Sequence, residues 1–145
     1  MSASSVNRDA PKNLTIEKLI TIYAFSGCGT GKYLGLAPES FVVGSDSCVE
    51  FGEIAAKNGH NVVACDNQNL PFRDNSFDAV ISVGVIHHFA SIKRREKALE
   101  ELYRILQPGG KMLVYVWAFE QDERKVCIWY RRGVQFETIN LSMLH

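Results

Sequence analysis

The feature that most constrains the fold is a series of short apolar runs, several of which lead into glycine or end on aspartate. Five runs have the length and composition of buried strands: LITIYAF (19–25), FVVGSD (41–46), NVVACD (61–66), FDAVISVGVI (77–86) and KMLVYVW (111–117). Segments with helical spacing stand between them, at VEFGEIAAKNG (49–59) and from Ile92 to Leu106. This alternation predicts an α/β fold with a mainly parallel sheet and helices on both faces.

Local signals predict where these elements end. The first helix is expected to take Asp46 or Ser47 as its N-cap and Gly59 as its C-cap. The segment QPGG (107–110) is expected to end the second helix, and KYLGL (32–36) to form a short helical turn.

Composition excludes several classes of protein. The chain has 145 residues, which fits one domain, and its 16 basic and 16 acidic residues cancel, unlike the basic field of a dedicated nucleic-acid-binding protein. The four cysteines form no C-x-x-C pair, so no metal site is expected and a reducing compartment is favoured. The sequence shows no signal peptide and no apolar run of membrane-spanning length. A cytoplasmic location is therefore expected, with the nucleus as the alternative.

Glycines and acids follow three of the predicted strands. Gly27, Gly29 and Gly31 follow the first strand, while Asp46 ends the second and Asp66 the third. Ligands of open α/β sheets bind beyond the carboxyl ends of the strands, where these residues are expected to meet. The loop GCGTG lacks the third glycine of the dinucleotide pattern G-x-G-x-x-G. It therefore favours S-adenosylmethionine, with the amino-acid end over the glycines, the ribose on Asp46 and the adenine near Asp66.

Other interpretations of these residues stay open. The glycines could form an ordinary tight turn, Asp46 could serve only as a helix cap, and Cys28 could simply fill a small space. His87 and His88 follow the fourth strand and are candidates for contact with the methyl acceptor, or for packing and capping. The KRRE segment is interpreted as a solvated helix face or as a phosphate contact.

Four segments resemble one branch of the class I methyltransferases: GCGTGKYLG, VVGSD, VACDNQNLPFRDNSFDAVISVGVIHHF and ILQPGGKMLVYVWAFEQ. They are similar to the tRNA wobble-uridine carboxymethyl methyltransferases, including the methyltransferase domain attached to an AlkB-type tRNA hydroxylase. The strings IHHF and YVWA-x-EQ are more specific than the glycine motif. The resemblance runs from Gly27 to Gln121.

The resemblance implies a Rossmann-like fold and a particular reaction. That family uses S-adenosylmethionine to esterify the carboxylate of 5-carboxymethyluridine at the tRNA wobble position, together with a small zinc-binding activator subunit. An acceptor carboxylate is already ionised near pH 7, so no general base is needed and positioning supplies the catalysis. By motif, the residues expected to bind the cofactor are Gly27, Cys28, Gly29, Thr30, Gly31, Asp46, Ser47, Asp66, Asn67 and Val83. No metal, DNA or membrane partner is implied.

The sequence departs from the family pattern at both ends. The family has an acid two residues before the first glycine, where this chain has Phe25, followed by Ser26. Restoring an acid at Phe25 is expected to strengthen cofactor binding. After Lys125 the family pattern stops, and the tail is expected to be too short for the two further strands of this fold, with room for one near VQFETINL (134–141).

These departures predict a truncated or alternatively spliced methyltransferase with impaired activity. The expected organisation is a disordered lead (1–13), a partial methyltransferase domain (14–121) that is incomplete at its C-terminal side, and a divergent tail (122–145). Two further functions stay open. One is methylation of a small molecule, and the other is a non-catalytic binding or regulatory module that keeps the fold.

Overall fold

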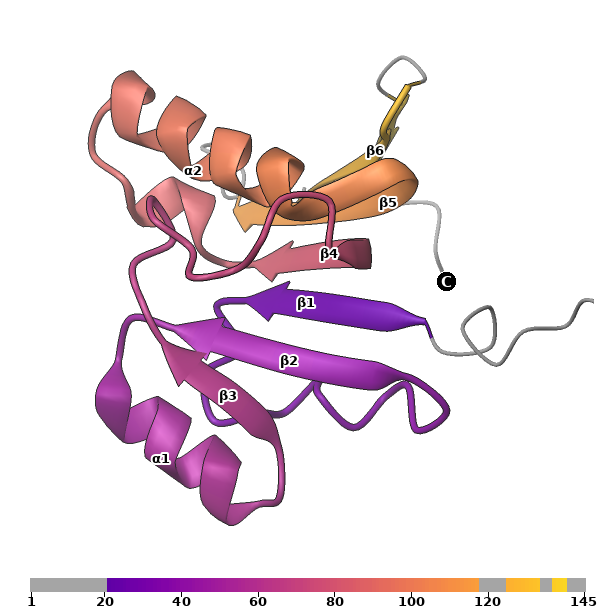
Figure 1. Ribbon diagram of the computed structural model, residues 1–145. Coiled ribbons are helices and arrows are strands. Elements are labelled where there is room, and N and C mark those ends of the chain that lie inside the picture. The colour runs from indigo at the N-terminus through magenta and orange to yellow at the C-terminus, as the bar shows by residue number, and fades with distance from the viewer. Residues whose placement is uncertain (1–20, 118–124, 134–136, 141–145) are drawn as a thin grey trace, which may run out of the picture.

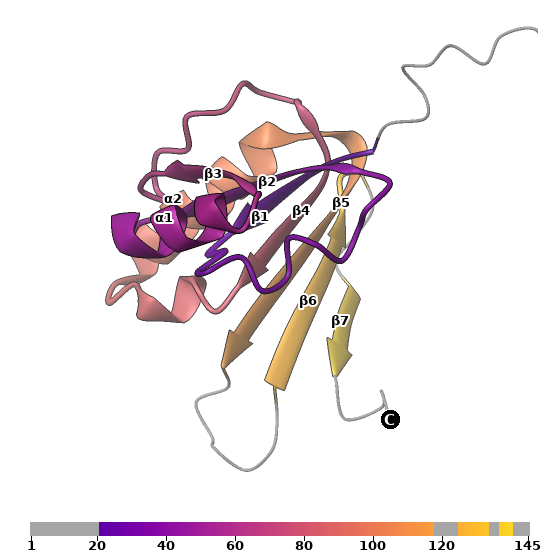
Figure 2. The same ribbon diagram turned by 90° about the horizontal axis from the view of Figure 1, so that it is seen from below.

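A computed structural model of the protein describes residues 21–117, 125–133 and 137–140. They form a seven-stranded sheet in the order β3-β2-β1-β4-β5-β6-β7 (Figure 1; β7 is labelled in Figure 2). The strands are β1 (Ile22–Ser26), β2 (Phe41–Asp46), β3 (Asn61–Ala64), β4 (Phe77–Val83), β5 (Leu106–Trp117), β6 (Lys125–Arg131) and β7 (Glu137–Asn140). The helices are α1 (Val49–Lys57), the 3-10 helix η2 (Ile86–His88) and α2 (Ile92–Ile105). No helix in these ranges is long and apolar enough to cross a bilayer.

The first five strands pair in parallel, as predicted, and this part of the sheet carries the candidate site. β1 lies between β2 and β4, so the chain runs outward to β3 in one direction and to β5 in the other. Right-handed crossovers that run in opposite directions place their helices on opposite faces of the sheet. α1 contacts β2 and β3, while α2 contacts β5. The carboxyl ends of the parallel strands meet at one edge, beside the start of α1.

Side chains that alternate along the strands fill two separate cores. The core under α2 includes Ala24, Val80, Leu102, Ile105, Met112 and Val114. The smaller core comprises Phe25, Cys28 and Leu34, with Val42, Val62 and Ile81 packed against it. The successive residues Ala24 and Phe25 on β1 belong to different cores, as expected for a central strand that is buried on both faces.

The tail contributes two strands to the sheet, so the expectation of room for only one was wrong. β6 pairs antiparallel with β5, and β7 pairs antiparallel with β6 (Figure 2). A parallel strand requires a crossover of about a dozen residues or more, whereas antiparallel neighbours require only a short turn. Two strands therefore fit into a short segment. The predicted boundary at residue 121 stays a prediction, and the predicted lead (1–13) lies outside the described residues.

The predicted caps of α1 were wrong by one or two residues at the N-terminal end and by one residue at the C-terminal end. Cys48 is the N-cap, because the Asp46 carboxylate accepts from the Cys48 N–H and closes a turn before the helix begins. Asn58 is the C-cap, and Gly59 follows it at a φ of 85°. A glycine one position beyond the cap is the usual way for a helix to end.

Other boundaries shifted by a few residues. β1 begins at Ile22, and Leu19 and Ile20 lie outside the described residues. β3 and β4 end two and three residues before the predicted positions, because the chain turns to form the cavity described below. The KYLGL segment forms successive turns rather than a helical turn, and QPGG lies within β5.

Candidate functional site

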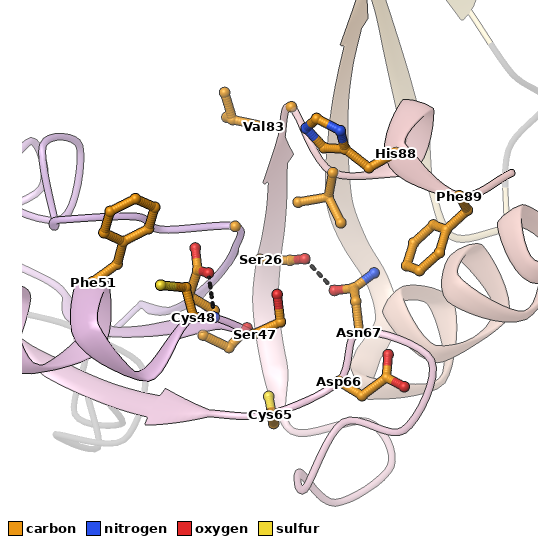
Figure 3. Close-up of a pocket in the computed structure, with 15 residues that line it drawn as sticks. Ser26, Ser47, Cys48, Phe51, Cys65, Asp66, Asn67, Val83, His88 and Phe89 are labelled. Carbon is orange, nitrogen blue, oxygen red and sulfur yellow. Dashed lines mark hydrogen bonds between the residues drawn. The ribbon is translucent and has the colours of Figure 1, made fainter.

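A cavity of about 400 Å³ lies at the carboxyl edge of the parallel strands. This volume is within the range of small-molecule sites, roughly 300–1,000 Å³. The residues that line it are Ser26, Gly27, Ser45, Asp46, Ser47, Cys48, Phe51, Cys65, Asp66, Asn67, Val83, Gly84, Val85, His88 and Phe89. Figure 3 shows Phe51 on one side and His88 and Phe89 on the other. The edge predicted from strand order is therefore the edge that holds the cavity.

Asp46 joins the glycine loop to the start of α1. One carboxylate oxygen accepts from the Gly29 N–H, with an N–Oδ2 distance of 2.8 Å, and the other accepts from the Cys48 N–H, with an N–Oδ1 distance of 2.9 Å. Each carboxylate oxygen can accept more than one hydrogen bond. Asp46 is thus held in place by the backbone and keeps acceptor capacity for a ligand hydroxyl.

The three glycines of the loop have different surroundings. Gly27 lines the cavity at a φ of 73°, and a Cβ added there would lie 2.2 Å from Cγ2 of Val85. Gly29 donates to Asp46, and no described residue other than its chain neighbours lies within 4 Å of the position its Cβ would take. A Cβ on Gly31 would lie 2.7 Å from Cδ2 of His60. Only Gly27 of the three is among the lining residues, so Gly29 and Gly31 support the loop from outside the cavity.

Several residues predicted from the sequence do not line the cavity. They are Cys28, Gly29, Thr30, Gly31 and His87. Cys28 is packed in the smaller core, where burial, followed by the charge of Asp46, raises the pKa of its thiol to about 11. The surroundings of Cys28 therefore agree better with its interpretation as a space-filling residue than with its interpretation as a cofactor contact.

The remaining predicted residues do line the cavity: Gly27, Asp46, Ser47, Asp66, Asn67, Val83 and His88. Asp66 is exposed, and its carboxylate accepts from the Gln68 N–H at 2.9 Å, which closes the turn after β3. Their individual roles toward a ligand stay predictions.

Eight lining residues were not predicted from the sequence: Ser26, Ser45, Cys48, Phe51, Cys65, Gly84, Val85 and Phe89. Ser45 and Cys65 directly precede the two predicted aspartates, and Ser26 directly precedes the first glycine. Their place next to strand ends was the available signal. Phe51 could not be found in this way, because it depends on how α1 is turned toward the cavity.

Two polar side chains meet inside the cavity. The hydroxyl of Ser26, at the end of β1, donates to Oδ1 of Asn67, which follows β3 (Figure 3). Both residues are buried, with exposed fractions of 2% and 9%. The amide nitrogen Nδ2 of Asn67 is buried and has no hydrogen-bond partner among the described residues. A buried donor without a partner is rare, so this atom is a candidate for contact with a ligand.

The two histidines after β4 differ in position. His88 lines the cavity and His87 does not, although their ring centroids are only 4.3 Å apart. The pKa of His87 is lowered, first by burial and then by the charges of His88 and Arg95. Arg95 donates from Nε to the carbonyl oxygen of Phe89 at 2.8 Å, which anchors it beside η2.

The loop that carries Asp66 and Asn67 is fixed from α2. Arg104 donates to the carboxylates of Glu101 and Asp74 and to the carbonyl oxygens of Leu70 and Phe72. The Glu101 carboxylate also accepts from the Leu70 N–H at 2.8 Å. Arg104 lowers the pKa of Glu101. This arrangement holds the wall of the cavity that Asn67 belongs to.

The charges of the lining favour a nucleoside without a polyphosphate. Among the residues that the structure describes, the lining contains two aspartates and neither lysine nor arginine. A pyrophosphate would meet these carboxylates without a compensating cation, whereas a cationic ligand would be favoured. Carboxylate acceptors suit ribose hydroxyls, and the aromatic rings of Phe51 and Phe89 suit a flat base. The residues present therefore fit S-adenosylmethionine, a nucleoside with a positive charge. Among the described residues, no group of three or more His, Cys, Asp or Glu could hold a metal ion.

Parallel strands in this order, with a glycine turn and an acidic residue at the carboxyl edge, define a doubly wound α/β domain that binds its ligand at that edge. The family described as "Methyltransferase domain" matches residues 26–114, which is more than half of the chain. The chain belongs to this family, and its fold is the Rossmann-like class I methyltransferase fold.

Two curated relatives are similar to most of this chain. "Probable tRNA methyltransferase 9B" from Mus musculus is 50% identical over 105 residues, covering 72% of this chain and 24% of the mouse protein. "tRNA (carboxymethyluridine(34)-5-O)-methyltransferase ALKBH8" from Macaca fascicularis is 45% identical over 113 residues, covering 78% of this chain and 17% of the macaque protein. The chain thus spans about a quarter or less of the length of these relatives.

Two solved structures share the fold. A structure described as a SAM-dependent methyltransferase from Thermotoga maritima is 34% identical, with a TM-score of 0.56 over 64% of this chain and 42% of that chain. A methyltransferase in complex with the Haloferax volcanii Trm112 methyltransferase activator is 27% identical, with a TM-score of 0.59 over 66% of this chain and 45% of that chain.

Proposed function

We propose that the chain is the methyl-transferring domain of a tRNA wobble-uridine carboxymethyl methyltransferase and binds S-adenosylmethionine in the cavity. The observation that carries this proposal is a cavity at the carboxyl edge of a methyltransferase-family sheet, whose described lining residues include two aspartates and no lysine or arginine. The names and identities of the mouse and macaque relatives support tRNA as the substrate. In particular, the acceptor would be the carboxylate of 5-carboxymethyluridine.

The residues of the cavity would bind and orient the two reactants. Asp46 would accept hydrogen bonds from the ribose hydroxyls. Backbone N–H groups hold both of its oxygens in place, and each oxygen keeps a further lone pair for the ligand. Gly27 would let the amino-acid end approach the backbone, since it carries no side chain between β1 and Val85. Phe51 and Phe89 would exclude water from the base. When bound, S-adenosylmethionine would supply an electrophilic methyl group.

On the acceptor side the chain would mainly provide position and charge. A carboxylate acceptor is ionised near neutral pH, so no side chain has to remove a proton. His88 lines the cavity, its ring centroid lies 4.3 Å from that of His87, and the charge of Arg95 acts on His87. A ring N–H of His88 would donate to the acceptor carboxylate and hold it at the cavity. Alignment of the two reactants would then supply most of the rate enhancement.

The activator subunit belongs to the same proposal. The Haloferax volcanii structure pairs a methyltransferase of similar fold with its Trm112 activator. We propose that this chain likewise works with a small zinc-binding activator, and that it does so in the cytoplasm or nucleus. Co-expression with such an activator and co-purification over size-exclusion chromatography would test the pairing.

The methylation assay tests the reaction directly. The full chain, with and without the activator, would receive S-adenosylmethionine labelled in the methyl group and tRNA that contains 5-carboxymethyluridine. The proposal expects label in an ester that mild base removes, and no label in matched tRNA whose wobble uridine lacks the carboxymethyl group. Label in a metabolite pool rather than in tRNA would instead support a small-molecule methyltransferase.

A non-catalytic binding module is the second candidate, and Phe25 is the observation that favours it. Where the family is expected to have an acid, this chain places an apolar ring that is 8% exposed in the smaller core. Binding of S-adenosylmethionine in calorimetry, without methyl transfer to tRNA or metabolites in the presence of the activator, would favour this second function.

A further inference from the structure

The contact between Ser26 and Asn67 fixes the direction of an amide group inside the cavity. The Ser26 hydroxyl donates to Oδ1 of Asn67. An asparagine amide has one acceptor oxygen and one donor nitrogen on opposite sides. With the oxygen held by Ser26, the nitrogen must face away from β1. Figure 3 shows this nitrogen directed away from Ser26, toward the side of the cavity where Phe89 lies.

The nitrogen that results from this orientation is a donor without an acceptor. Nδ2 of Asn67 has no hydrogen-bond partner among the described residues. The residue is only 9% exposed, so solvent does not readily supply one. Leaving a buried donor unpaired is unfavourable, and a ligand that brings an acceptor to this point removes that penalty. A ligand without such an acceptor would keep it.

Phe89 indicates what kind of acceptor fits. Its aromatic ring lines the cavity on the side that Nδ2 faces (Figure 3). Aromatic side chains pack well against flat ring systems, in stacked or edge-to-face arrangements. A flat heterocycle beside Phe89 would present its edge to Nδ2, and the acceptors on such an edge are ring nitrogens. A purine offers three of them that carry no hydrogen.

We propose that Ser26 is a positioning residue, which turns the Asn67 amide so that its NH₂ group donates to a ring nitrogen of the bound base. The cavity would thereby select its ligand by an acceptor on the base, in addition to any contact of the ribose with Asp46. This inference rests on the proposed function, because it takes the ligand to be the nucleoside part of S-adenosylmethionine. The inference is particular to this chain, because Ser26 is one of the two positions before Gly27 at which the sequence departs from the family pattern.

The experiment compares ligands that differ by one ring nitrogen. Calorimetry on the full chain would measure binding of S-adenosylhomocysteine and of its 1-deaza, 3-deaza and 7-deaza analogues, in each of which one ring nitrogen becomes C–H. We expect one analogue to bind roughly tenfold more weakly than the parent, because it leaves Nδ2 unpaired. The same ligands should protect Cys48 and Cys65, which also line the cavity, from alkylation in the same order.

The variants assign this discrimination to Ser26. Ser26→Thr keeps the hydroxyl and is expected to keep the tenfold ratio, while Ser26→Val, which has the shape of threonine but no hydroxyl, is expected to reduce the ratio to less than about threefold. Ser45→Ala is the matched control: Ser45 pairs with Ser26 across the strands and lines the same cavity, but its hydroxyl donates to the carbonyl oxygen of Phe25. The Ser45→Ala variant should still bind the parent ligand about tenfold more tightly than the weakest deaza analogue, even if its affinity for both ligands changes. Asn67→Ala in the presence of Ser26 should abolish the ratio.

The outcomes separate this inference from the proposed function. Equal binding of all three analogues to the unchanged chain would overturn the inference while leaving the proposed function intact. A full ratio in Ser26→Val, or in Asn67→Ala if Ser26→Val fails to fold, would also overturn it. If S-adenosylhomocysteine neither binds nor protects the two thiols, the proposed function fails, and the inference fails with it.

Discussion

The Gly29 N–H donates to the Asp46 carboxylate at 2.8 Å, and this contact joins the bonds from the Gly27 and Cys28 N–H groups to the carbonyl oxygen of Ser45 in tying the glycine loop to the end of β2. The other carboxylate oxygen accepts from Cys48 at the start of α1. Asp46 is therefore a structural acceptor and a candidate ligand contact at once. The two roles can be separated by experiment.

Replacing Asp46 with alanine should weaken both the fold and ligand binding. Loss of two hydrogen bonds to backbone N–H groups is expected to lower the free energy of unfolding by about 1–3 kcal/mol. Loss of a charged acceptor for the ribose should reduce the affinity for S-adenosylhomocysteine by about 10- to 100-fold. Urea unfolding and calorimetry measure the two effects. Lower stability with unchanged affinity of the folded fraction would show that Asp46 acts only in the structure.

Gly27→Ala should be far more disruptive than Gly29→Ala. Both glycines have positive φ, 73° and 52°, so each alanine carries a strain of about 1–2 kcal/mol. Only at Gly27 would the new Cβ also meet Val85, at 2.2 Å, and the carbonyl oxygen of Val83, at 3.0 Å. Thermal unfolding of the two variants measures the difference. Val85→Ala combined with Gly27→Ala should recover part of the loss, and equal effects of the two single variants would contradict this account.

Phe25→Asp is expected to destabilise the protein rather than to repair it. The sequence alone suggested that an acid here would strengthen cofactor binding. The structure gives the opposite expectation, because Phe25 is packed with Cys28 and Leu34 and is 8% exposed. A carboxylate in that position would be buried without a partner, at a cost of about 3 kcal/mol or more. Phe25→Leu, which keeps an apolar side chain, is the control in denaturant unfolding. Tighter ligand binding by a stably folded Phe25→Asp protein would restore the original expectation.

His87 should make the protein less stable as the pH falls below neutrality. Burial and the neighbouring charges lower its folded-state pKa below the ordinary value of about 6.5. The unfolded chain therefore takes up a proton first, and stability is lost as the pH falls through about 6.5. NMR titration of the imidazole measures this pKa directly. Arg95→Gln should raise it, since Arg95 contributes to the shift, and His87→Gln should flatten the pH dependence of unfolding between about pH 7.5 and 5.5. A measured pKa at or above the ordinary value would contradict the prediction.

Arg104→Lys should destabilise the loop between β3 and β4 despite keeping the charge. A lysine cannot reach two carboxylates and two carbonyl groups at once, so about 2–3 kcal/mol of unfolding free energy should be lost. Because Arg104 lowers the pKa of Glu101, the unchanged protein loses stability when acid titrates Glu101 through that lowered pKa. Denaturant unfolding at pH 7 and at about pH 3.5 measures both effects. Arg94→Lys, at an exposed position of the same helix, is the control.

The sequence predicted the parallel part of the sheet because each strand and its boundary depend on local signals. β2 was predicted to the residue, and the edge that holds Asp46 and Asn67 followed from strand order. β7 falls within the tail strand expected near residues 134–141, whereas β6 was missed, because its pairing depends on β5 rather than on its own sequence. The polar contact of Ser26 with Asn67 was missed for a similar reason. The two residues are far apart in the chain and meet only when β1 and the loop after β3 pack together.

The unequal size of the two cores has a consequence for how the molecule opens. Among the residues whose burial is described, the core under α2 contains eleven buried residues, whereas the core around Phe25 contains three. Regions with few buried contacts exchange their amide hydrogens through local openings rather than through global unfolding. The glycine loop and Leu34 belong to the thinner side, so the wall of the cavity formed by that loop should be able to loosen while β4, β5 and α2 stay folded. A ligand that contacts both Asp46 and Asn67 would link the side of the glycine loop, which opens more easily, to the side that α2 holds in place. Ligand binding should then slow amide hydrogen exchange in residues of the glycine loop that the ligand does not contact.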